Sequence, residues 1–562
     1  MKTRFGSGIA SISIHTVTLG GLALVTLTGE RASASAATWR NVGTDWATSG
    51  NWNPSGPPVA NETATFGFVT SADIKNPNLA APATVGTLSI DNSDADYSVT
   101  QTGSQTLTLS TIASPPKVLV ITGGGTTNIA PQIATGGTKT FDTGSTAVTL
   151  QGGLATVTGS DLTLTLANST KVVVSGNVTN NDAGTARTIT LDGAGSMEVT
   201  GSVTGGTKGI SLGSTANFSG TLTLSKANSL TNDTVWRAGT LAINADSALG
   251  GKNISLGTAT SGTNSVAVLT SGAYSVGANF SVNLNPATKS FTIGGTQTTG
   301  TSTYTGTVNL SNITKASSGG LNLTSAAGGT VIFGGAISGA STTADFVTKI
   351  GEGTVQLTAA NTYAGGTEVK AGTLLVDNTT GSGTGSAGVN VTGGSLGGKG
   401  TIAGAVSVSS GSLAPAEHAA LVLQNGLSFT GGGLNIDIGG NSSYDAVQVT
   451  SGDIALGSGL ASLSLTQSFS PTANGTFWVL DNTGSGSLSG YFAGLASSGA
   501  TVPFAGGNVY KIYYNANHAT NSLSGGNDVA ITVAVPEPGS LALIGIGIAG
   551  LLWRRRKAAE GI

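Results

Sequence analysis

The sequence predicts an all-β protein, specifically a right-handed parallel β-helix, or β-solenoid, with capped ends. Short runs of β-branched and apolar residues recur along most of the 562 residues, and glycine, asparagine, aspartate and serine separate them. No amphipathic window of useful helical length interrupts these runs. Each run is too short to bury a face alone, so it must stack on the runs of neighbouring turns and share one interior with them.

Composition narrows the function classes. The chain contains 88 glycines and no cysteine, so disulfides and thiolate metal sites are excluded and stability must come from backbone ladders and packing. Only 9% of the residues are charged and the net charge is −3, which provides no basic surface for nucleic acid. We therefore expect no nucleic-acid partner, and no motif indicates a cofactor.

Residues 1–36 have the features of a secretory signal peptide: a basic start, an apolar stretch from Ile9 to Leu27, and a tract of small residues. Cleavage after Ala34 fits the small-x-small pattern with Ala32, and cleavage after Ala36 fits it equally well. An uncleaved membrane anchor is the alternative. Internal threonine and glycine residues make the stretch a poor permanent span.

Residues 37–84 contain three of the six tryptophans, Trp39, Trp46 and Trp52. We expect their rings to close the first end of the solenoid, where unpaired strand edges would otherwise invite aggregation. Sugar binding on an aromatic face is the alternative reading of the same residues.

Residues 85–426 are predicted to form the solenoid itself. In runs such as Leu162–Leu166, apolar side chains alternate with threonine, which suits a strand with one buried face. After Gly388 the runs become shorter and the chain should wind more tightly. Residues 427–534 have longer runs and more aromatics, which predicts a C-terminal β region or cap.

The clearest repeat covers residues 349–376, where Thr373-Leu374-Leu375-Val376 is the last of three short runs divided by glycines. Alternation along this run places Leu374 and Val376 inward and Leu375 outward. The string Asn361-Thr362-Tyr363, Gly365-Gly366-Thr367 and Ala371-Gly372-Thr373-Leu374 resembles the autotransporter-associated β-strand repeat. That resemblance implies an architecture and no particular chemistry.

Residues 535–557 hold three features in order: Pro536-Glu537-Pro538, an apolar stretch to Trp553, and the basic cluster Arg554-Arg555-Arg556-Lys557. The apolar stretch predicts a short transmembrane helix with its basic end in the cytoplasm. The whole tail resembles the PEP-CTERM sorting signal. This resemblance implies transient contact with an exosortase-type membrane protease, which would remove the tail; a permanent C-terminal anchor is the alternative.

Candidates for catalysis are few. His418 and His518 are the histidines that follow residue 36, and each is expected to face solvent rather than to act as a base or ligand. The acidic cluster from Asp91 to Asp96 lacks the spacing of a calcium loop and is better explained by a turn. We therefore expect no catalytic residue, no metal site and no enzyme. The alternative is a polysaccharide lyase or hydrolase on a β-helix scaffold.

These features together predict an exported protein of the cell surface or extracellular matrix. Adhesion or a structural role in the matrix is the expected function, and extracellular polysaccharide or other surface polymers are the expected lasting partners. Before processing, the tail would hold the protein in the inner membrane.

Overall fold

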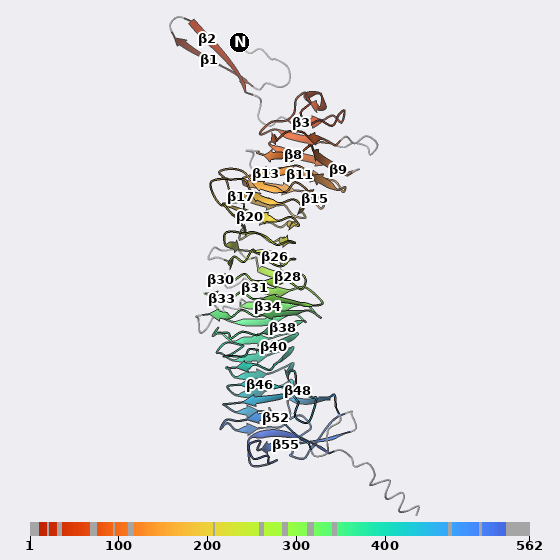
Figure 1. Ribbon diagram of the computed structural model, residues 1–562, viewed down its shortest axis with the longest axis vertical. Helices are drawn as coiled ribbons and strands as arrows, with labels where there is room; N and C mark the ends of the chain where they lie inside the picture. The colour runs from red at the N-terminus through yellow and green to blue at the C-terminus, as the bar shows by residue number, and fades with distance from the viewer. Residues whose placement is uncertain are drawn as a thin grey trace, which may run out of the picture. The chain divides into compact units, whose positions relative to one another are not determined.

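The computed structural model in Figure 1 describes residues 11–19, 22–30, 36–67, 76–93, 96–110, 117–205, 208–257, 264–283, 290–311, 320–339, 345–469, 475–504 and 508–534. The described residues are almost entirely β and form about 15 turns of parallel β-solenoid, as predicted. The chain divides into two compact units. The first comprises residues 1–335 and 339–345, and the second comprises residues 336–338 and 346–562.

Over residues 83–204 of the first unit, each turn contributes one strand to each of three parallel sheets (Figure 1). The third of these sheets ends at β22 (Val203–Thr204). One such turn consists of β17 (Leu162–Leu166), β18 (Lys171–Val174) and β19 (Val178–Asn180). Alternate side chains of β17 are buried, and β17 pairs with β20 (Arg187–Gly193) of the next turn. Apolar residues thereby form rows along the interior, because each buried side chain stacks on its counterpart one turn later.

At the first end of this unit, two of the three sheets continue into the predicted cap. The first sheet extends from β8 (Thr87–Asp91) through β5 (Thr63–Phe66) and β3 (Ala36–Trp39) to the antiparallel β4 (Trp52–Asn53). The second sheet ends at β6 (Asn78–Leu79), which residue Asp45 covers through a parallel bridge. The third sheet begins at β7 (Ala83–Val85), and among the described strands β7 pairs with β10 (Thr106–Leu109) alone.

The second unit contains the predicted repeat as β37 (Val347–Ile350), β38 (Thr354–Leu357), β39 (Thr367–Val369) and β40 (Thr373–Val376). β38 and β40 pair in parallel, with Val355 opposite Leu374. Leu374 and Val376 are buried, whereas Leu375 is half-exposed, so the predicted inward and outward assignment is confirmed.

The first turn after Gly388 is short, as predicted, whereas later turns lengthen again, since Gly433 pairs with Ser462. Ser395 in β42 (Ser395–Gly398) pairs with Ser412 in β45 (Ser412–Pro415), 17 residues later. In the first unit, the equivalent step from Leu162 reaches Ile189. Fewer residues per turn leave shorter loops between the strands.

The described part of the second unit ends in two different ways. The sheet containing β52 (Thr476–Asn482) is closed by three antiparallel strands, β56 (Asp528–Ala534), β55 (Val509–Ala516) and β54 (Thr501–Val502). The sheet containing β48 (Gly433–Ile438) instead stops at β51 (Ser462–Gln467). Antiparallel strands block further parallel stacking, because they change the hydrogen-bond pattern of the edge.

Several predictions concern residues at the two ends of the chain. Residues 11–30 contain an antiparallel pair, β1 (Ser11–Leu19) and β2 (Leu22–Glu30), and β3 starts at Ala36. Ala32, Ala34, and the whole tail, with the predicted transmembrane helix, lie outside the described residues. Signal-peptide cleavage and the domain boundaries stay predictions. Within the described ranges, no helix has the length and apolar character needed to cross a membrane.

Candidate functional site

The three tryptophans predicted to act together form one packed cluster. Trp52 is fully buried, and its ring meets those of Trp39 and Trp46 edge-on with centroid distances of 5.0 Å. Phe66 contacts all three rings and also packs against Tyr97 of the next turn. Each such aromatic pair adds about 1 kcal/mol to the burial of apolar area. The rings of Trp39 and Trp52 are covered by their neighbours and offer no open face to a sugar.

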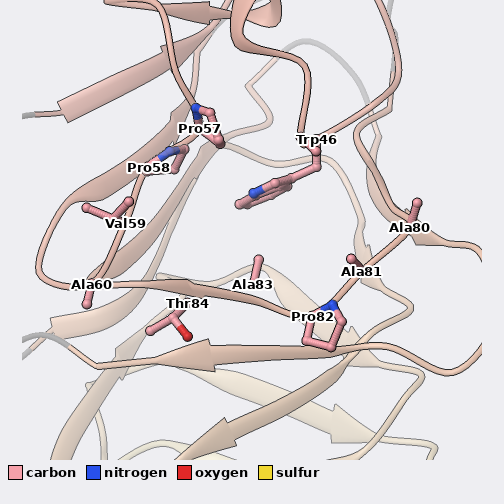
Figure 2. Close-up of a pocket in the computed structure, with 11 residues that line it drawn as sticks. Trp46, Pro57, Pro58, Val59, Ala60, Ala80, Ala81, Pro82, Ala83 and Thr84 are labelled. Atoms are coloured by element: carbon pink, nitrogen blue, oxygen red, sulfur yellow. The ribbon is translucent and has the colours of Figure 1, made fainter.

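A pocket of about 310 Å³ lies beside this cluster, and Figure 2 shows the Trp46 ring projecting into it. The indole Nε1 of Trp46 is buried and has no acceptor among the described residues. None of the described residues that line the pocket is ionisable, so they offer neither a general acid nor a general base. The remaining lining consists of small apolar residues, prolines and one threonine: Ala47, Pro57, Pro58, Val59, Ala60, Ala80, Ala81, Pro82, Ala83 and Thr84.

The repeat in the second unit contains a buried cation. Lys349 is completely buried, and its ammonium donates to the carbonyl oxygens of Ile350, Gly351 and Ala371 at 3.0, 2.7 and 2.9 Å. All three ammonium protons therefore have acceptors. Burial lowers the pKa of Lys349 to about 8, although the charge of Glu352 opposes this shift. The ammonium ties β37 to the turn that precedes β40.

Gly372 makes room for this ammonium. Its φ of 61° lies in the left-handed region, and a Cβ placed there would come within 2.4 Å of the carbonyl oxygens of Gly351 and Gly353. The same Cβ would lie 2.7 Å from Nζ of Lys349. Only glycine fits both restraints. Sequence reasoning singled out the glycine as a turn but missed the role of the lysine, because its third acceptor lies 22 residues away.

His418 belongs to a hydrogen-bonded network rather than facing solvent alone. Its Nε2 lies 2.8 Å from Oδ2 of Asp437. Burial alone would raise the pKa of Asp437, but hydrogen bonds from His418 and Thr466 leave that pKa below its ordinary value. Asp445 accepts the backbone N–H groups of His418 and Asp437, and burial raises its pKa. The carboxylates thus tie the loop that contains His418 to β48 and to the loop that follows it.

His518 is similarly engaged. Its ring stacks on Trp478 with a centroid distance of 4.7 Å, and its Nδ1 lies 3.1 Å from Asp481. Its backbone N–H donates to Asp528, which also accepts the N–H of Asn482. Burial raises the pKa of Asp528. The expected exposure to solvent is confirmed for His518, whose side chain is 45% exposed, and holds in part for His418, which is 33% exposed. The sequence did not show the acidic partner that each ring also has.

The acidic cluster at the end of β8 accepts backbone N–H groups, one nearby and one from a later segment, in the residues that the structure describes. Asp91 accepts the backbone N–H of Ser93, which is the geometry of an aspartate turn. Asp96 accepts the N–H of Thr126, and this bond lowers the pKa of Asp96. Asp94 is outside the described residues. Across the described ranges, no three histidine or acidic side chains gather as they would around a metal ion.

Two family models match parts of the chain. The passenger-associated-transport-repeat model matches residues 219–243 and 347–376, and the PEP-CTERM protein-sorting motif matches residues 534–557. A search of curated proteins found no match. Both resemblances found in the sequence are therefore confirmed. The repeat at 219–243, which spans β24 (Thr221–Leu224) and β26 (Gly239–Ile243), was missed because it lacks the Asn-Thr-Tyr string.

Proposed function

Because this secreted β-solenoid carries passenger-type repeats and a PEP-CTERM sorting motif, we propose that it is a non-catalytic structural component of the cell surface or extracellular matrix. The sorting motif is the observation that carries the proposal, since it indicates export and processing by an exosortase at the membrane. The motif begins at the end of β56, so nearly the whole solenoid precedes it. Removal of the tail would release the solenoid to the outside.

The organisation of the polar groups supports a structural role. Asp445 and Asp528 each accept two backbone N–H groups, and the Lys349 ammonium is occupied by three carbonyl groups. Groups engaged in this way stabilise turns and are poorly placed to transfer protons to a substrate. The described residues that line the pocket beside Trp46 are neutral. A repeated scaffold of this kind supplies extent and rigidity, which suit adhesion or matrix formation.

Processing is tested by intact-mass measurement on protein from the exporting host. We expect the mature protein to lack residues 541–562. Replacing Pro536 and Pro538 together by alanine should leave the tail in place and keep the protein in the membrane fraction, whereas the matched replacement Pro503→Ala outside the motif should not. Full tails on most wild-type molecules would contradict processing.

The structural role is tested by location and by turnover. Immunogold labelling should place the wild-type protein on the cell surface or in the matrix, and purified protein should leave uronic-acid, glucan and chitin-type polysaccharides uncleaved. Binding without cleavage agrees with the proposal. Product formation that disappears in Asp445→Asn would instead establish a carbohydrate-active enzyme.

A further inference from the structure

The pocket beside Trp46 lies at an open strand edge. β7 is the outermost described strand of the third sheet, and two of its residues, Ala83 and Thr84, also line the pocket. Figure 2 shows the Ala83 methyl group pointing toward the Trp46 ring, which in turn faces Pro57 and Pro58. An open edge presents backbone N–H and C=O groups to a ligand that enters such a pocket.

The hydrogen-bond pattern shows which groups of this edge are free. The carbonyl of Val85 accepts the N–H of Ser110, so Val85 directs its polar groups toward β10. Polar groups alternate in direction along a strand, so Thr84 directs its N–H and C=O away from β10. Among the described residues, neither group has a partner. The edge is therefore open at Thr84.

The open stretch is too short for another strand. Gly86 has the same direction as Thr84, but its N–H already donates to the carbonyl of Glu62. On the other side of Thr84, Pro82 has no N–H to donate. The free edge thus offers a single N–H, whereas pairing with an added strand uses several. A small ligand that carries an acceptor and a donor close together fits this edge better than a peptide does.

The lining restricts the chemistry of the ligand further. The described residues that line the pocket are uncharged, so they offer no charged partner to a carboxylate, phosphate or ammonium group. Alanine, proline and the Trp46 ring make up most of the walls, and such surfaces favour a methyl group or the apolar face of a sugar ring. The volume of about 310 Å³ is near the lower limit for small-molecule sites, which suits one sugar residue.

Trp46 supplies a further polar group at the pocket. Its side chain is 4% exposed, and its buried Nε1 has no acceptor among the described residues. Buried indole N–H groups are normally paired, so this donor is a second, independent indication that an acceptor belongs beside it. A ligand with two oxygen acceptors would satisfy both Trp46 and Thr84.

We propose that this pocket binds one neutral N-acetylated amino-sugar residue of an extracellular polysaccharide. The acetamido carbonyl would accept the Thr84 N–H, and a ring hydroxyl would donate to the Thr84 carbonyl. A second sugar oxygen would accept the Trp46 N–H, while the acetyl methyl group packs between Trp46 and Ala83. The site rests on the proposed function, because it names the class of polymer that the surface protein would hold.

The same contacts disfavour other common sugars. A glucan residue has a hydroxyl in place of the acetamido group, so it would leave the apolar walls without a methyl group. A uronic-acid residue would bring a carboxylate against uncharged walls. Burying either polar group without a partner is unfavourable, so both should bind more weakly.

Isothermal titration calorimetry tests this selectivity on the full chain recovered from the exporting host. We expect binding of triacetylchitotriose, and binding weaker by at least about tenfold for cellotriose and for trigalacturonate. No binding of triacetylchitotriose, or equal affinity for cellotriose, would overturn the proposal. Tighter binding of an acetylated pentapeptide of alternating valine and threonine would overturn it in favour of strand addition.

Two variants locate the binding. Thr84→Pro removes the free N–H, and proline is tolerated on a strand edge whose N–H points away from the sheet. It should weaken triacetylchitotriose binding by about tenfold or more, whereas the matched variant Thr84→Val keeps the N–H and should bind as wild type does. Ala83→Leu fills the pocket and should abolish binding. Circular dichroism checks that each variant is folded, and wild-type affinity in folded Ala83→Leu or Thr84→Pro would overturn the proposal.

Failure of this proposal can be told apart from failure of the proposed function. Tail processing and immunogold labelling report where the protein goes, and neither depends on Thr84. Protein that reaches the surface but binds no amino sugar would overturn the sugar site alone. Protein that binds triacetylchitotriose through Thr84 but stays inside the cell would support the site and overturn the proposed location.

Discussion

Replacing Lys349 by methionine should change how the stability of the solenoid depends on pH. Methionine keeps an unbranched apolar stem and removes the ammonium that donates to Ile350, Gly351 and Ala371. Without the ammonium, position 349 no longer binds or releases a proton as the pH changes. The free energy of unfolding of the variant should therefore lack the rise with pH that Lys349 gives the wild-type protein. This holds whatever the stability of the variant at neutral pH.

The sign follows from the two pKa values of Lys349. Its folded-state pKa of about 8 lies below the ordinary value of 10.5, so between these values the folded chain binds fewer protons than the unfolded chain. The free energy of unfolding then rises with pH, by at most about 1.4 kcal/mol for each pH unit. From pH 8 to pH 10 the wild-type protein should gain about 2 kcal/mol from this lysine, and Lys349→Met should gain nothing from position 349.

The measurement is urea unfolding of the full chain, followed by circular dichroism at several pH values between 7 and 10. Tyr363 sets the upper limit, because burial raises its pKa and stability must fall once unfolded tyrosines ionise. The matched control is Lys370→Met, which removes an exposed lysine paired with Glu368 in the same repeat. A stability difference between wild type and Lys349→Met that stays constant from pH 8 to 10, or that Lys370→Met reproduces, would refute the reasoning.

Three further predictions concern the same scaffold. Leu374→Asp should lower the free energy of unfolding by several kcal/mol because it buries a carboxylate without a partner, whereas Leu375→Asp should cost under about 1 kcal/mol. Thermal unfolding and protease sensitivity compare the two variants. Equal losses of stability would contradict the alternation of inward and outward side chains. Gly372→Ala should destabilise the repeat by more than about 1 kcal/mol, because the Cβ of the alanine would meet two carbonyl oxygens. The loss should appear as a lower midpoint of urea unfolding, and an unchanged midpoint would contradict that geometry. The signal peptide should be cleaved after Ala34, since cleavage after Ala36 would remove the first residue of β3. Edman sequencing of the mature protein checks the site, and an N-terminus at Ala37 would disprove cleavage after Ala34.

The sequence by itself determined the fold class, the inward face of individual strands and the sorting signal. Alternation is a local property, so Leu374 and Val376 could be placed inside from the run that contains them. Motifs such as Pro536-Glu537-Pro538 are also contiguous, and they can be identified without knowing what lies beside them.

Only the tertiary structure decided which residues meet across turns. A turn takes 17 residues from Ser395 to Ser412, whereas in the first unit the turn that starts at Leu162 extends to Ile189. The partner of a given side chain therefore cannot be found by counting a fixed number of residues. The third carbonyl bound by Lys349 and the carboxylate beside His418 both come from another turn.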